Sequence, residues 1–242
     1  MRKLGSVAAI GAGLLMWALG STPGAEAALD GATVTGKVKF VGKAPPNPAI
    51  DMSEEAKCAA KYTTPPREPV VVANANGTLA NVLVYVKAGL PADAKYPTPA
   101  TPVTIDQSAC LYHPRVFGIM VGQTLAIKNS DGILHNIKAL GKKNRPFNIS
   151  QPIAMTTTRS FTTVEVMLPF ECNVHGWMHA WAAVLAHPFF SVTGTDGSFG
   201  ITGLPPGTYT IEAWHEKYGT QTATVTVKAA EAKTADFTYT AK

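Results

Sequence analysis

Alternation of apolar and polar residues with a period of two is the dominant pattern along this chain. It is clearest in residues 33–41, where Val34, Val38 and Phe40 share one face, and in residues 222–228, where apolar residues alternate with threonines. In a β-strand, a period of two places the apolar side chains on one face of the sheet. Both segments are therefore predicted to be half-buried β-strands.

Three further segments are predicted to be strands. Residues 82–86 are apolar on both faces, which is typical of a central strand that is covered on both sides. Residues 122–129 and 179–185 are also expected to be strands, one before and one after the segment that carries the chemistry below. Turn signals separate these runs at Asn76-Gly77, Asp196-Gly197 and Pro205-Pro206-Gly207. Many short strands with such turns predict an all-β protein built as a sandwich or barrel.

One short helix interrupts this pattern. Ser53 is its expected N-cap, with Glu54 and Glu55 in the first turn, where acidic residues are favourable. The Pro-rich stretch 87–102 is expected to be a surface loop.

The N-terminus has the pattern of an export signal. Arg2 and Lys3 precede the uncharged apolar run 7–19, and residues 25–27 form a small-x-small cleavage pattern. A membrane-spanning helix needs about 20 apolar residues. Because this run is shorter and contains glycines, cleavage is favoured over a membrane anchor. Residues 1–27 are expected to be a signal peptide, and the mature chain to be periplasmic or secreted.

The composition is that of a globular chain with a real core, with 46% hydrophobic and 15% charged residues. The formal net charge of +5 is spread along the chain, apart from the cluster Lys142-Lys143-Asn144-Arg145. A solvated loop is the favoured interpretation of this cluster, with a docking patch for an acidic partner as the alternative. The charges do not form a nucleic-acid-binding face, so nucleic acid is not an expected partner.

Three cysteines in an exported chain leave one cysteine unpaired. We expect a disulfide between Cys58 and Cys110, which leaves Cys172 as a free thiolate for a metal. Closing that loop would stabilise the fold by about 4 kcal/mol on the loop-entropy model. The alternative is that Cys110 and His113 form half of a metal site, although no partner half-site is visible in the sequence.

Residues 172–178 carry the strongest chemical signal. They present a thiolate, an imidazole and a thioether at three-residue intervals, at Cys172, His175 and Met178. Together with a second imidazole, these donors are the ligand set of a blue-copper electron-transfer site. His135, which arrives from another strand end, is the candidate for that second imidazole. The expected cofactor is one copper ion that cycles between Cu(I) and Cu(II).

Residues 172–178 also resemble the amicyanin-type copper loop of the cupredoxin family, which reads Cys-x-x-His-[Pro/Gly]-aromatic-Met. The pair His135-Asn136 fits the same family, and the likeness extends over residues 116–185. It implies a Greek-key cupredoxin β-sandwich of the plastocyanin and amicyanin kind. A minimal cupredoxin has its first histidine early in the chain, whereas a long segment precedes His135. Residues 44–105 are therefore an elaboration or part of another unit.

The same resemblance implies a role for each residue of the site. The implied metal ligands are His135, Cys172, His175 and Met178. Asn136 would tie the two ligand loops together by hydrogen bonds. The electron would enter and leave through the imidazole edge of His175, surrounded by an apolar patch whose candidate members are Ile133, Gly176 and Trp177. For Trp177, buried packing and an exposed surface for a redox partner remain equally open.

The C-terminal part has a different resemblance. Residues 195–199 and 204–209 are similar to the carboxypeptidase regulatory-like module, a small β-sandwich. We therefore expect residues 28–190 to form a cupredoxin-like domain with an N-terminal elaboration, and residues 191–242 to form a second, smaller β-sandwich. Because residues 33–41 look like the first strand of that module, it stays open whether the module is discontinuous.

The expected function is that of an exported type 1 copper protein. It would carry single electrons between redox partners such as a c-type cytochrome and a dehydrogenase, and would not be an enzyme. A copper-storage or structural, adhesion-type role is the alternative. Multicopper oxidases and copper nitrite reductases need further histidine-bound copper, which is connected to the first copper through a histidine adjacent to the cysteine. Here Glu171 precedes Cys172, and the chain contains no His-x-His pair. Covalently bound haem is excluded because Cys-x-x-Cys-His is absent.

Overall fold

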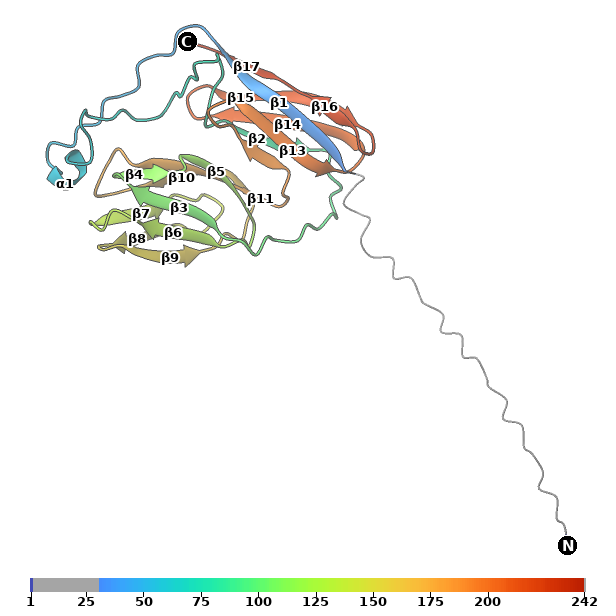
Figure 1. Cartoon of the computed structure of the whole chain (residues 1–242), viewed down its shortest axis with the longest axis horizontal. Coiled ribbons are helices and arrows are strands. Elements are labelled where there is room, and N and C mark those ends of the chain that lie inside the picture. Colours follow the sequence, from blue (N-terminus) through green and yellow to red (C-terminus); the bar gives the residue numbers. More distant parts are fainter. Residues whose placement is uncertain (2–30, 242) are drawn as a thin grey trace.

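The computed structural model describes Met1 and residues 31–241. The expected signal peptide, residues 1–27, lies outside the described residues apart from Met1. In the described part, strands dominate and the helix α1 (Ala56–Ala59) is a single turn (Figure 1). No helix within these residues is long and apolar enough to cross a membrane. The expected all-β fold is confirmed.

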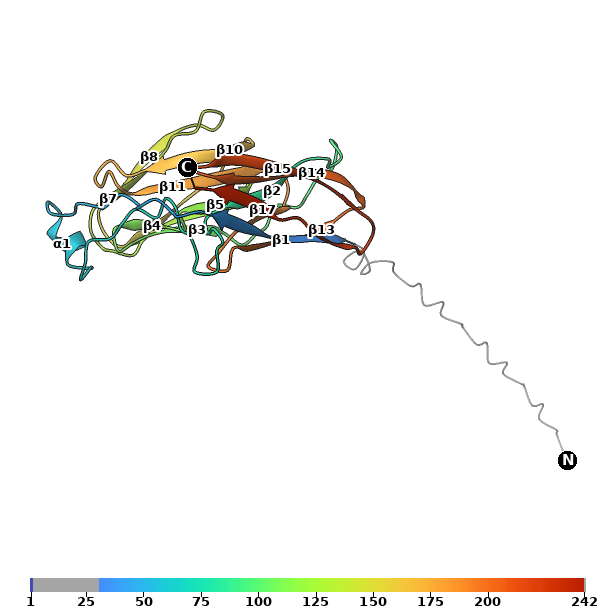
Figure 2. The ribbon, with the colours of Figure 1, turned by 90° about the horizontal axis from the view of Figure 1, so that it is seen from above.

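The strands form two β-sandwiches that lie side by side (Figures 1 and 2). The first pairs a five-stranded with a four-stranded sheet. The strands of the five-stranded sheet are, in spatial order, β5 (Val116–Met120), β11 (His179–Leu185), β10 (Glu165–Glu171), β7 (His135–Ala139) and β8 (Phe147–Gln151). Those of the four-stranded sheet are β4 (Leu111–His113), β3 (Val103–Ser108), β6 (Leu125–Asn129) and β9 (Met155–Arg159). Its core joins Ile105 and Ile127 of one sheet to Ile137 and Phe170 of the other. Burial of each such side chain contributes about 1.5–3 kcal/mol.

The second sandwich combines C-terminal strands with two strands from early in the chain. Its sheets consist of β13 (Ser198–Leu204), β1 (Ala32–Val41), β16 (Ala232–Thr234) and β17 (Phe237–Thr240), and of β12 (Phe190–Val192), β2 (Leu83–Ala88), β14 (Gly207–His215) and β15 (Gly219–Val227). β1 pairs with β13, β16 and β17, and β2 lies between β12 and β14. β2 is buried on both faces over its first four residues, as its unbroken apolar run predicts.

This pairing differs from the linear division that the sequence suggested. Residues 28–190 were expected to form the first domain, yet β1 and β2 lie in the sheets of the second sandwich. The second module is thus discontinuous in the chain, which answers the question that residues 33–41 left open. The physical reason is that the alternating face of β1 is buried against C-terminal strands, in a core that includes Val38 and Phe237. The exact domain boundaries stay a prediction.

A buried ion pair joins the two sandwiches. The guanidinium of Arg115, before β5, donates to both carboxylate oxygens of Glu216 at 2.7 and 2.9 Å. The indole of Trp181 also donates to Glu216, at 3.1 Å, and its ring lies 5.4 Å from that of Trp214. A bidentate, nearly buried pair of this kind is strong and directional, so it sets the orientation of one sandwich on the other.

Between β1 and β2 the chain leaves the second sandwich and reaches the far end of the first, where α1 lies (Figure 1). The expected N-cap at Ser53 is wrong. The helix begins at Ala56 after Glu55, and no side chain caps it. The reason is local: the Ser53 amide donates to the Asp51 carboxylate, and the Glu55 amide donates to the Met52 carbonyl, so a turn occupies these residues instead.

Candidate metal centre

Two segments meet at one end of the five-stranded sheet. His135 is the first residue of β7, and β10, which runs antiparallel beside it, ends at Glu171. Residues 172–178 then form the loop that turns back into β11. The Met178 amide donates to the His175 carbonyl at 3.0 Å, which keeps this loop tight. Sheet pairing therefore brings His135 next to a loop that lies about 40 residues further along the chain.

Three nitrogen and sulfur donors converge there. Nδ1 of His135 lies 2.8 Å from Nδ1 of His175, and Cys172 Sγ lies 3.9 Å from the same His175 atom. The donor atoms of the three residues all lie within 4.8 Å of one another. Two donors that each bind one ion at about 2.0–2.3 Å can be no more than roughly 4.3 Å apart, so the separations of 2.8 and 3.9 Å suit a shared ion. The three side chains are at most 3% exposed.

The tautomer of His135 is set by Asp131. The Asp131 carboxylate accepts a hydrogen bond from Nε2 of His135 at 2.9 Å, so the proton is on Nε2 and the Nδ1 lone pair faces His175. Burial lowers the pKa of both histidines, and for His175 the neighbouring His135 lowers it further. Both imidazoles are thus neutral near pH 7, which is the form that binds a metal.

Backbone amides surround the sulfur of Cys172. The amides of Asn136 and His175 point at Sγ, at 3.5 and 3.4 Å. These two contacts hold the sulfur in one position. Tyr112 packs close by, and burial, followed by the nearby Cys172, raises the pKa of its hydroxyl. Tyr112 stays neutral and donates to the Asn136 carbonyl at 2.6 Å.

Asn136 bridges the two ligand segments. Its side-chain oxygen accepts from the Asn173 amide at 2.5 Å, and its amide group donates to Asn148 on β8. These contacts are the kind of link that the cupredoxin resemblance implied for this residue. Met178 is fully buried in the same hydrophobic cluster as Cys172. Its assignment as the weak axial ligand stays a prediction.

Asp131 is a candidate site residue that the sequence analysis missed. Besides His135, its carboxylate accepts from the amides of Ala109 and Cys110 at 2.8 and 2.7 Å, and Lys61 lies 2.9 Å away. Burial alone would raise the pKa of this carboxyl, but the hydrogen bonds from Lys61, Cys110 and His135 hold it below its usual value. The position of this carboxylate, four residues before a candidate histidine ligand, is a sequence feature from which the contact could have been predicted.

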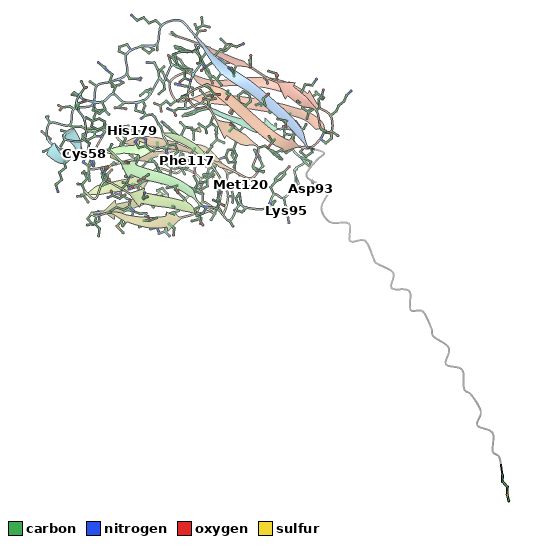
Figure 3. The ribbon with its side chains drawn as sticks, in the orientation of Figure 1. Cys58, Asp93, Lys95, Phe117, Met120 and His179 are labelled. Carbon is green, nitrogen blue, oxygen red and sulfur yellow. A yellow bond between two sulfur atoms is a disulfide. The ribbon has the colours of Figure 1, made fainter. Side chains whose placement is uncertain are left out.

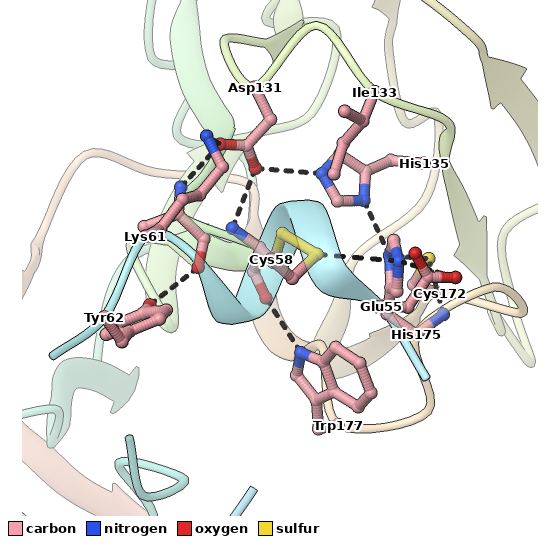
Figure 4. The surroundings of a disulfide bond; sticks show 12 residues. Glu55, Cys58, Lys61, Tyr62, Asp131, Ile133, His135, Cys172, His175 and Trp177 are labelled. Atoms are coloured by element: carbon pink, nitrogen blue, oxygen red, sulfur yellow. Dashed lines mark hydrogen bonds and ion pairs between the residues drawn. A yellow bond between two sulfur atoms is a disulfide. The ribbon is translucent and has the colours of Figure 1, made fainter. Parts of the chain in front are cut away.

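A second element covers the site: residues 50–62, which contain α1 and which we call the cap (Figure 4). The cap is held by a disulfide between Cys58 and Cys110, the pairing that the cysteine count suggested. The Tyr62 hydroxyl also donates to the Ala109 carbonyl at 2.6 Å. Because Cys110 is in a disulfide, it offers no thiolate, and the alternative half-site of Cys110 and His113 is excluded.

The cap changes the expected exposure of His175. The electron was expected to pass through the imidazole edge of His175, yet this side chain is only 1% exposed. Its Nε2 atom faces the cap, with Cys58 Sγ and Glu55 Oε1 both 3.8 Å away (Figure 4). Trp177 is half-buried, stacks at a tilt 5.1 Å from the His175 ring and donates to the Cys110 carbonyl at 2.9 Å. The indole is therefore part of the contact between the metal loop and the disulfide.

Comparisons with known proteins cover parts of the chain. Residues 184–240 match the family described as Carboxypeptidase regulatory-like domain. That match confirms the C-terminal resemblance and begins at the end of β11. No curated protein matches the chain significantly.

Similar solved structures include several copper proteins. A copper-containing nitrite reductase from Thermus scotoductus SA-01 is 21% identical with a TM-score of 0.33, over 40% of this chain and 25% of that one. A purple cupredoxin from Nitrosopumilus maritimus is 22% identical with a TM-score of 0.29, over 34% of this chain and 98% of that one. An oxidized proline-to-glycine mutant of amicyanin is 15% identical with a TM-score of 0.32, over 42% and 98%. This chain thus spans about a quarter of the nitrite reductase. The case for a metal centre rests on the side-chain geometry above.

Proposed function

We propose that this chain is an exported type 1 copper protein that carries single electrons between redox partners. The supporting observation is the buried convergence of two imidazole Nδ1 atoms and one cysteine sulfur, from segments that sheet pairing brings together. Two imidazoles with a thiolate form the trigonal donor set of blue-copper sites. Met178 is the proposed axial ligand, and one copper ion is the proposed cofactor.

The protein's own residues hold this donor set in one arrangement. Asp131 fixes the tautomer of His135, the amides of Asn136 and His175 point at the Cys172 sulfur, and burial excludes water. Copper bound there would supply a one-electron couple between Cu(I) and Cu(II). Because the ligands are locked by their hydrogen bonds, they need to move little when the charge of the site changes. Small rearrangement is the property that a rapid electron carrier needs.

The decisive experiment is copper loading of the purified mature chain. One equivalent of Cu(II) should give a strong thiolate-to-copper band in the visible, and Cys172→Ser should abolish that band. His113→Asn is the matched control, since this imidazole is exposed and belongs to none of the grouped donor residues. A chain that takes up copper without the band, or whose band survives Cys172→Ser, would refute the proposal.

Copper storage or a structural role is the second candidate, because His175 is covered by the cap and the C-terminal segment matches a regulatory-like module. The two candidates differ in kinetics. A carrier exchanges electrons quickly between its Cu(I) and Cu(II) forms and retains the metal. A store releases copper readily to a chelator and exchanges electrons slowly. We propose the carrier, with a c-type cytochrome or a dehydrogenase as partner, no role as an enzyme, and a periplasmic or secreted location.

A further inference from the structure

The buried position of His175 raises the question of where an electron would leave the protein. Its Nε2 atom points at the cap, and its closest contacts there, at 3.8 Å, are too long for strong hydrogen bonds. The other neighbour of the ring is the half-buried Trp177. Electron transfer slows steeply with distance, so a partner has to approach over the cap or over Trp177.

A groove lies at that place. Its lining residues come from the cap and from the metal loop: Asp51, Met52, Ser53, Glu54, Glu55, Val174 and Trp177. We call it the cap groove, and its volume is about 340 Å³. Among the lining residues, Glu55 faces His175 and Trp177 packs on the same ring. The groove is therefore lined by two side chains that contact the buried imidazole directly.

The cap groove is acidic on a protein that is basic overall. Asp51, Glu54 and Glu55 line it, and Asp51 and Glu54 form no salt bridge in the described part of the chain. Hydrogen bonds from Ser53 lower the pKa of Asp51, which keeps that carboxylate charged. Lys57 on α1 offsets part of this charge, yet the chain as a whole carries +5. The local field at the groove thus differs in sign from the net charge.

Apolar side chains accompany these carboxylates. Leu134 and Val174, which immediately precede the two histidines, are 46% and 39% exposed. Val174 lies in the groove itself. A small face of exposed apolar side chains next to charged groups is suited to a brief encounter, in which charge steers the approach and few side chains are buried.

We propose that the cap groove is the docking face for a redox protein whose own redox centre is surrounded by basic residues. This inference rests on the proposed function, because it names the partner class of the same copper centre. The basic cluster Lys142-Lys143-Asn144-Arg145 is excluded from this face, since it lies in the loop that follows β7 at the end away from His135.

The test uses the copper-loaded mature chain and probes of opposite charge. Stopped-flow spectroscopy follows reduction by the hexaammineruthenium(II) cation and by the hexacyanoferrate(II) anion, and then by a c-type cytochrome with a basic haem edge. The variants are Asp51→Asn and Glu54→Gln. Asp93→Asn is the matched control, an exposed carboxylate at the opposite end of the molecule from Cys58 (Figure 3).

We expect each groove variant to slow reduction by the cationic probe about threefold at roughly 0.01 M ionic strength. This factor is the screened Coulomb attraction that is lost when one unit charge about 10 Å from a divalent cation is removed. The difference should vanish near about 1 M salt, where screening is nearly complete. The anionic probe should speed up, and Asp93→Asn should change neither rate. The basic cytochrome should follow the cationic probe.

Groove variants that react like Asp93→Asn while retaining the visible band would overturn the docking face and leave the copper centre intact. A parent chain without the band would overturn both proposals before any kinetics. A dimer of the copper-loaded chain that is lost in Glu54→Gln would assign the groove to a second copy of this chain, and would also overturn the inference.

Discussion

The replacement Asp131→Asn tests how far one carboxylate controls the metal centre. The carboxylate accepts from His135 Nε2 and the Cys110 amide at one oxygen, and from the Ala109 amide and Lys61 at the other. An amide group has a single accepting oxygen. Whichever way asparagine is turned, its NH₂ group faces two of the four donors.

The magnitude follows from those two lost acceptors. A buried donor without an acceptor costs about 1–3 kcal/mol. Lys61 is 32% exposed in its side chain and can turn to water, so its loss counts least. We therefore expect the metal-free protein to lose about 2–4 kcal/mol of unfolding free energy. If the NH₂ group faces His135, the imidazole is no longer held with its proton on Nε2, and copper affinity should fall about 10–100-fold.

Two measurements check this prediction. Urea unfolding of the metal-free chain gives the change in stability, and titration with Cu(II), followed by the visible band, gives the change in affinity. Asp93→Asn is again the control, because it removes an exposed carboxylate with the same substitution. If Asp131→Asn unfolds at the same urea concentration as the parent and binds copper as tightly, the assignment of Asp131 as the residue that positions His135 is wrong.

Three more predictions follow from other parts of the fold. Replacing both Cys58 and Cys110 by alanine opens a loop of 52-residue separation and should lower the free energy of unfolding in urea by about 4 kcal/mol. The His175 ring should also become accessible to solvent exchange, and an unchanged urea midpoint would contradict this prediction. Burial, with the nearby Arg115 and Lys217, lowers the pKa of the fully buried His215 to about 4. The unfolded chain then binds the extra proton between pH 6.5 and 4, so stability should fall by about 3 kcal/mol as the pH drops through that window, and the fall should be missing in His215→Asn. Glu216→Gln leaves the guanidinium of Arg115 without its bidentate partner and should cost about 3–5 kcal/mol, measured by thermal unfolding against Glu54→Gln, an exposed control.

Much of the candidate metal centre can be predicted from the local sequence. Cys172, His175 and Met178 are close together in the chain, so a short loop brings their side chains near one another whatever the rest of the fold does. Three cysteines in a chain that is expected to be exported predict one disulfide and one cysteine left over. The alternation in residues 33–41 and 222–228 predicts strands because the backbone geometry of a strand has a period of two. These inferences need only neighbouring residues.

Contacts between distant segments were decided by the tertiary structure. The position of His135 beside Cys172 depends on the pairing of β7 with β10, and the role of Asp131 depends on the approach of residues 109–110 to its carboxylate. The burial of His175 depends on the disulfide that fixes the cap over the imidazole edge, and the loop sequence alone does not indicate this cap. β1 and β2 join the second sandwich although they precede the first in the chain. Periodicity states which face of a strand is apolar, but the partner that buries this face is chosen by packing of the whole chain.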